Sequence, residues 1–149
     1  MLKPERVVSA AFSKDGRFLL LCTGLTAEVW SLEIFQRLKI VHGVSGADFL
    51  HGSFSPDGRQ FYTMGERQNV RIWETVSGAA LTSFWCPEHR MALPTFSPDG
   101  RWIMTTSNDA EDHTIYVHSV RTEDLLRKAE HLVPASLKAE DRQRLLEAW

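Results

Sequence analysis

The chain has 149 residues, which is enough for a globular domain with a buried core. A hydrophobic share of 43% and a charged share of 24% are ordinary for a folded protein, so the composition argues against intrinsic disorder. The formal net charge of −2 removes the general electrostatic argument for nucleic acid or an anionic membrane as a partner. No apolar run approaches the roughly 18 residues that a transmembrane helix needs.

A five-residue turn motif occurs three times in the chain. It reads Phe-Ser-Lys-Asp-Gly from Phe12 and Phe-Ser-Pro-Asp-Gly from Phe54 and Phe96, and the phenylalanines lie 42 residues apart both times (54 − 12 and 96 − 54). Proline presets the first corner, aspartate can bond the backbone ahead of it, and glycine takes the left-handed position that closes a hairpin. A fixed period of this size indicates a repeat architecture.

Each period is predicted to contain short strands separated by turn residues. Strands are expected at 7–12, 18–23, 27–32 and 34–41 in the first period, at 49–54, 60–64, 70–73 and 80–85 in the second, and at 91–96, 102–106 and 113–118 in the third. Apolar residues then take helical spacing over 122–133, Pro134 ends that helix, and a last helix is expected over about 139–149. Helix therefore replaces the fourth strand of the third period.

With these residues in hand, the chain resembles the WD-repeat β-propeller family over roughly residues 5–120. In that family the third strand of each repeat ends in Trp-Asp or a variant, and the corresponding pairs here are Trp30-Ser31, Trp73-Glu74 and His118-Ser119. The stretch from Asp112 to Val117 follows the family's approach to that pair. The resemblance implies an all-β fold of three four-stranded antiparallel blades, the last lacking its outer strand, and we expect a C-terminal α-helical tail after them.

The expected organisation is a three-blade segment over 1–121, with repeats at about 5–42, 47–85 and 89–121, and a helical tail over 122–149. The tail resembles the ends of WD-repeat regions in multidomain bacterial signalling proteins, where an enzymatic or nucleotide-binding domain usually precedes the propeller. The family's buried polar network, from His through Ser or Thr and Asp to Trp, is complete in no copy. We therefore expect the blades to depend mainly on apolar packing.

Three blades are too few for a closed ring, because propellers typically close with about 4–8. The chain is interpreted as the C-terminal part of a longer propeller, as one of several copies that complete a ring, or as a decayed or misassigned reading frame. Leu145, Leu146 and Trp149 would dock the last helix on the open third blade, with an intermolecular helix contact as the alternative.

The sequence shows no catalytic constellation. It has no nucleophile elbow, no Gly-rich phosphate loop and no zinc spacing among its six histidines, so we expect no enzyme activity, no cofactor and no metal. Cys22 and Cys86 lie in apolar stretches and are expected to be buried, reduced thiols. Reduced thiols fit a cytoplasmic location.

Two sets of positions are singled out for structure and binding. The first is structural: the turn phenylalanines are expected to anchor the blade cores, together with the other repeat positions (Phe12, Phe54, Phe96, Trp30, Trp73, Asp112). The second is a partner-binding rim on the side opposite the turn motifs, formed by loops that carry partner contacts in the family (His42, Arg67, Trp85, His89, Arg90).

The function expected from these observations is a non-catalytic protein–protein interaction scaffold or sensor module, part of a larger or oligomeric propeller. The expected partner is a protein, and another copy or a companion propeller chain would complete the ring. One alternative is an accessory propeller segment of a hydrolase, kinase or NTPase whose catalytic domain is absent from this chain. Another is a self-assembling structural ring.

Overall fold

The computed structural model of the chain describes residues 7–42, 49–65, 69–85, 93–106 and 114–121. These residues form eleven β-strands and no helix, as the all-β expectation requires. The predicted helical tail and Asp112 lie outside the described residues. The strands are β1 Ser9–Phe12, β2 Phe18–Cys22, β3 Thr26–Ser31, β4 Gln36–His42, β5 Phe49–Phe54, β6 Gln60–Gly65, β7 Asn69–Glu74, β8 Ala80–Trp85, β9 Thr95–Phe96, β10 Trp102–Thr106 and β11 Ile115–Ser119.

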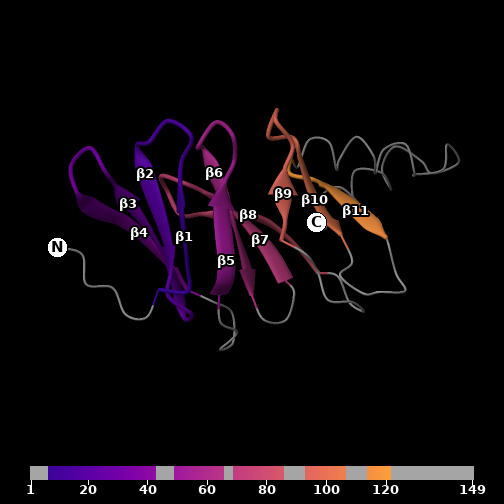
Figure 1. Cartoon of the computed structure of the whole chain (residues 1–149), viewed down its shortest axis with the longest axis horizontal. Helices are drawn as coiled ribbons and strands as arrows, with labels where there is room; N and C mark the ends of the chain where they lie inside the picture. The colour runs from indigo at the N-terminus through magenta and orange to yellow at the C-terminus, as the bar shows by residue number, and fades with distance from the viewer. Residues whose placement is uncertain (1–6, 43–48, 66–68, 86–92, 107–113, 122–149) are drawn as a thin grey trace, which may run out of the picture.

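The strands form three antiparallel sheets in which each strand pairs with the next along the chain. The first sheet has the order β1-β2-β3-β4, the second β5-β6-β7-β8, and the third β9-β10-β11. Within the described residues the third sheet therefore has three strands, while the first two have four. The sheets stand side by side in chain order, with the turns that follow β1, β5 and β9 at the same end (Figure 1).

The three turn motifs close their hairpins with the same hydrogen bonds. In the second copy the Ser55 hydroxyl donates to the Asp57 carboxylate at 2.7 Å, and the same carboxylate accepts from the Arg59 amide at 3.1 Å. Ser55 Oγ also accepts from the Gln60 amide at 3.0 Å. Gly58 has a φ of 69°, the left-handed region that glycine tolerates without strain. The first and third copies repeat these bonds, so the turn chemistry predicted from the motif is confirmed.

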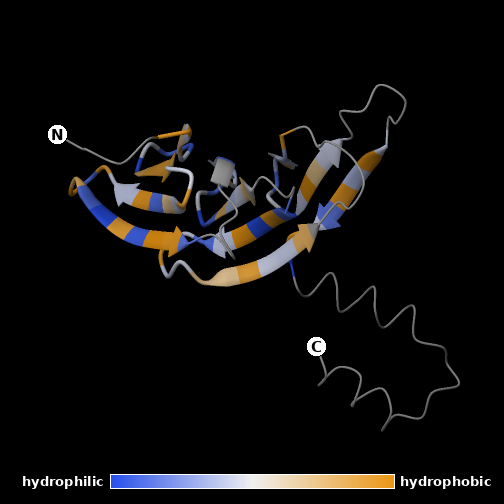
Figure 2. Cartoon of the chain, turned by 90° about the horizontal axis from the view of Figure 1, so that it is seen from below, coloured by the Kyte–Doolittle hydropathy of each residue, from blue (hydrophilic) through white to orange (hydrophobic). Residues whose placement is uncertain are grey.

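The sheets are joined by face-to-face apolar packing. Between the first and second sheets, Leu20 and Val29 pack with Phe61 and Trp73 in one buried cluster. Between the second and third sheets, the buried cluster includes Tyr62, Val70, Ile72, Ile103 and Val120. Figure 2 shows the strands forming a curved array, with hydrophobic residues recurring along each strand. The core is thus divided into two layers, each lying between neighbouring sheets.

The expectation that each turn phenylalanine anchors a core is wrong for the first copy. Phe54 is buried and lies 6.3 Å, between ring centroids, from Phe18 of the preceding sheet. Phe96 similarly lies 5.8 Å from Tyr62 of its preceding sheet. Phe12 belongs to the first sheet, has no preceding sheet in the described residues, and is 67% exposed. Burial of the turn phenylalanine therefore depends on the preceding sheet, which covers Phe54 and Phe96.

The fourth strand of the first period begins later than predicted. The segment 32–35 forms a turn before β4, so Ile34 and Phe35 are turn residues with 56% and 77% of their surfaces exposed. Phe35 has a φ of 51°, whereas glycine occupies the equivalent place in the β7–β8 turn, where Gly78 has a φ of 69°. A left-handed conformation costs a residue with a Cβ roughly 1–2 kcal/mol. Apolar content alone could not separate this turn from a strand.

We expect replacement of Phe35 by glycine to raise the free energy of unfolding by up to about 1 kcal/mol, because relief of the strained turn exceeds the extra entropy of the unfolded chain. Urea denaturation followed by tryptophan fluorescence measures this change. The matched control is Gly78→Ala in the equivalent turn, which should lower stability by about 1 kcal/mol. Destabilisation by Phe35→Gly would contradict the prediction.

The turn aspartates make stability depend on acid pH. The pKa values of Asp15 and Asp99 are lowered chiefly by the serine hydroxyls that donate to them, and at Asp57 such hydrogen bonds outweigh the opposing effect of burial. Because the folded pKa lies below the ordinary 3.8, the stabilisation is complete above about pH 4 and is lost as pH falls through the folded pKa. We expect a triple Asp→Asn variant to lose less stability than the parent between neutral pH and about pH 3 in urea titrations. Equal losses of stability in the variant and the parent would show that other titrating groups cause the acid sensitivity.

Candidate functional site: a groove across the inner strands

An open groove of about 570 Å³ crosses the first strands of the three sheets. Its floor combines phenylalanine and tyrosine rings with three prolines, and its polar groups come from serine, histidine and lysine side chains. The lining residues are Phe12, Lys14, His51, Ser53, Phe54, Ser55, Pro56, Tyr62, Leu93, Pro94, Thr95, Phe96 and Pro98. A concave surface that combines aromatic and proline side chains with polar groups is the kind of site that can bind a peptide segment.

Tyr62 links the second and third sheets at the floor of the groove. Its hydroxyl donates to the carbonyl of Pro94 at 2.7 Å and lies 3.0 Å from Nδ1 of His51. The His51 and Tyr62 rings are stacked with centroids 5.8 Å apart. Burial raises the pKa of the Tyr62 hydroxyl and lowers that of His51, so both groups are neutral at physiological pH. The groove therefore offers a neutral, aromatic floor.

Strand β5 approaches the first sheet closely at Gly52. A Cβ added at Gly52 would lie 2.8 Å from both Leu20 Cδ2 and the carbonyl oxygen of Tyr62. Glycine is therefore required at this position of β5 for the two sheets to pack at the observed separation.

Part of a buried polar network survives in the second sheet. Trp73 Nε1 donates to the Thr63 hydroxyl at 2.8 Å, and the guanidinium of Arg71 lies 5.3 Å from the centre of the Trp73 ring. At the equivalent place in the first sheet, Trp30 Nε1 donates instead to the Glu28 carboxylate at 2.9 Å. Both tryptophans thus keep a hydrogen bond to a polar side chain of their own sheet.

The predicted partner-binding rim is not assembled by the described residues. His42 is exposed at the end of β4, and Trp85 ends β8, although its side chain is not described. Arg67, His89 and Arg90 lie outside the described residues. The rim therefore remains a prediction.

Cys22 is free and 1% exposed, as predicted, and burial raises the pKa of its thiol to about 12, while Cys86 lies outside the described ranges. No group of three or more His, Cys, Asp or Glu side chains gathers there in a way that could hold a metal ion. The same ranges contain no helix able to span a membrane.

Comparison with known proteins bears directly on the repeats. A family model described as "WD domain, G-beta repeat" matches residues 85–119, which include the whole third sheet. The first two sheets share the turn motif and the equivalent strand register with the matched sheet. The chain carries WD repeats. WD repeats generally act as non-catalytic scaffolds that bind protein partners.

Three known proteins from different eukaryotes are similar in sequence to this chain. Pre-mRNA-processing factor 19 of Schizosaccharomyces pombe is 27% identical over 125 residues, covering 83% of this chain and 24% of the relative. Nuclear distribution protein PAC1 of Candida dubliniensis is 28% identical over 107 residues, covering 64% and 20%. Apoptotic protease-activating factor 1 of Mus musculus is 39% identical over 49 residues, covering 32% and 4%. The WD-repeat chain thus spans less than a quarter of the length of each of these relatives.

Sequence reasoning missed the groove. His51, Tyr62 and Pro94 belong to three separate segments, and no local motif connects them. Only the repeat could have indicated it, because the groove is lined by residues at or near the first strand of each repeat.

We expect Tyr62→Phe to lower the free energy of unfolding by about 1–3 kcal/mol, because the buried carbonyl of Pro94 loses its donor. Urea denaturation measures the loss. The chain's second tyrosine supplies a matched control, since Tyr116 is half-buried on β11 and Tyr116→Phe should change stability by less than about 0.5 kcal/mol. Equal effects of the two substitutions would show that the hydrogen bond contributes nothing specific.

Proposed function

We propose that the chain is a non-catalytic protein–protein interaction module, a scaffold or sensor that acts in the cytoplasm as part of a larger or oligomeric propeller. The groove is the observation that carries this proposal. It is open, its floor is aromatic and proline-rich, and its polar groups at Tyr62 and His51 are already hydrogen-bonded. Such a site suits binding rather than proton transfer or nucleophilic attack.

The occupant that fits the groove best is an extended segment of a protein partner. Leu93 is 55% exposed at the groove and offers an apolar contact, while Pro94 and Phe96 supply a rigid wall beside it. Lys14 is exposed at the other side and would favour an acidic residue in the segment. The predicted rim of His42, Arg67, Trp85, His89 and Arg90 would form a second contact surface for the same partner.

A library of random peptides selected on the immobilised chain tests this proposal. We expect enriched peptides to carry an aromatic or aliphatic anchor and to lose at least about tenfold in affinity for a Leu93→Asp variant. Val76→Asp is the matched control, because Val76 is 62% exposed in the β7–β8 turn and does not line the groove. Binding that depends on Arg90→Glu but not on Leu93→Asp would move the site to the rim. Absence of any peptide that prefers the parent over Leu93→Asp would refute the groove as a binding site.

A further inference from the structure

The two packed layers between sheets use the same register positions each time. One face of the second sheet places Phe54, Phe61 and Trp73 against the first sheet, and all three are at most 7% exposed. The other face of the second sheet places Tyr62, Val70 and Ile72 against the third, and these are at most 1% exposed. Each sheet thus has two distinct apolar faces, and opposite faces of neighbouring sheets pack together.

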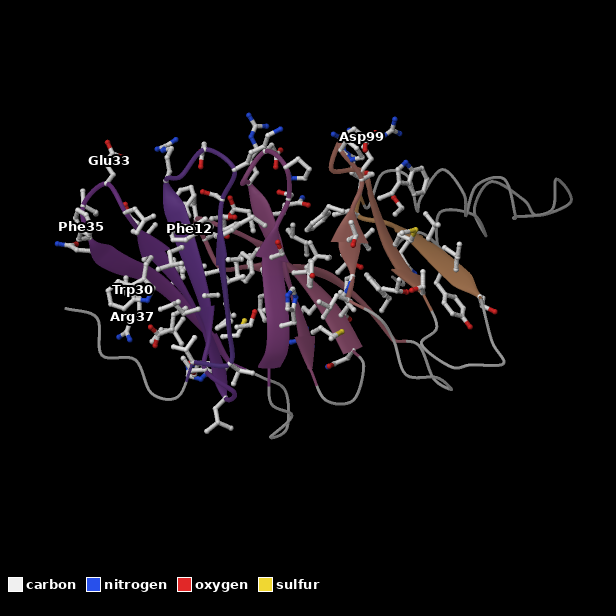
Figure 3. All side chains as sticks on the ribbon, in the orientation of Figure 1. Phe12, Trp30, Glu33, Phe35, Arg37 and Asp99 are labelled. Atoms are coloured by element: carbon white, nitrogen blue, oxygen red, sulfur yellow. The ribbon has the colours of Figure 1, made fainter. Side chains whose placement is uncertain are left out.

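Within the described residues, the first sheet leaves one of these faces without a neighbouring sheet. Strand pairing gives Phe12, Leu19 and Trp30 the positions that Phe54, Phe61 and Trp73 hold in the second sheet. We call these three residues the leading face. Phe12 is 67% exposed, and Leu19 and Trp30 are each only partly buried. Figure 3 shows Trp30 on the part of the first sheet that lies away from the second, and Phe12 on β1.

No other described sheet covers the opposite kind of face on the third sheet. Strand pairing gives Met104, Ile115 and Val117 the positions of Tyr62, Val70 and Ile72. We call these three residues the trailing face. They are 40%, 59% and 55% exposed, whereas their counterparts in the first sheet, Leu20, Ala27 and Val29, are fully buried.

The polar groups of the leading face are already paired within the first sheet. The Glu28 carboxylate accepts from Trp30 at 2.9 Å and from Arg37 at 3.2 Å, and the Arg37 guanidinium lies 5.9 Å from the centre of the Trp30 ring. Figure 3 shows Trp30 and Arg37 close to one another on this sheet. Covering this face would therefore leave no unpaired carboxylate or indole N–H at Glu28 and Trp30, which removes the largest cost of burial.

We propose that the leading face of one copy of this chain packs on the trailing face of a second copy, and that two copies close a ring through two identical junctions. The junctions inside the chain supply the argument, since they show these two kinds of face packing together twice. Two copies of three sheets give six, which lies within the roughly 4–8 blades of closed propellers. This inference rests on the part of the proposed function that makes the chain one member of an oligomeric propeller, and it does not depend on what the groove binds.

Light scattering on the purified full chain measures the assembly directly. We expect a discrete species of twice 17.0 kDa at micromolar concentration. Val117→Asp should weaken the dimer at least about tenfold, and Phe12→Asp on the opposite face should do the same. Val76→Asp is again the matched control, because it places the same charge at a similarly exposed valine outside both faces and should leave the mass unchanged. Circular dichroism checks that each variant remains folded.

Cross-linking tests which faces meet. Phe96 lies 5.8 Å from Tyr62 across the second junction, so Phe12 of one copy should lie beside Met104 of the other. In a Cys86→Ser background, a short bis-maleimide should join Phe12→Cys to Met104→Cys when the two variants are mixed. Neither variant alone should form a cross-linked pair. Cys22 should not compete, because its thiol is buried and its pKa is raised.

Three results would overturn the proposal. A monomer of 17.0 kDa would leave the two faces to sheets of another chain or to other segments of this one. A cross-linked pair formed by Phe12→Cys alone would show like faces meeting. Open assemblies larger than two copies would show that the junction does not close a ring. Failure of peptide selection at the groove would affect none of these readings, so the two proposals fail separately.

Discussion

Packing of one sheet face against the next is the interaction on which the rest of this structure depends. A four-stranded antiparallel sheet of this size has two apolar faces and cannot bury either by itself. Phe61 and Trp73, stacked with ring centroids 6.3 Å apart, are buried only because the first sheet covers them with Leu20 and Val29. Each sheet therefore needs a neighbouring sheet to bury its apolar face, and the next repeat of the sequence supplies that neighbour.

This dependence explains where polar chemistry is found. The serine and aspartate side chains of the turn motifs form hydrogen bonds that close the hairpins. The Glu28 carboxylate accepts hydrogen bonds from Trp30 and Arg37. Tyr62 bridges His51 and Pro94 across two sheets. The polar groups thus fix the geometry of the repeats, and the groove keeps an aromatic surface whose hydrogen bonds are already made. Such a surface is suited to selecting a partner by shape and apolar contact.

Much of the fold follows from the sequence because hairpins are local. The period of 42, the turn motifs and the alternating strands placed most of the strands of the two four-stranded sheets within a few residues of their observed bounds. Prediction failed at Ile34 and Phe35, where an apolar pair forms a turn with a left-handed residue. It also failed at Phe12, whose burial depends on a sheet that the described residues do not include. The groove was missed because its walls come from segments about one repeat apart.

The sequence by itself determined the repeat: its length, its turn chemistry and the strands between turns, since each of these depends on residues only a few positions apart. Only the tertiary structure decided which of three equivalent phenylalanines are covered and which strands approach closely enough to require Gly52. It also decided that the described sheets leave one open face of each kind. The physical reason is that burial belongs to a pair of sheets and not to a residue. The same motif can anchor a core at Phe54 and remain exposed at Phe12 without any change in local sequence.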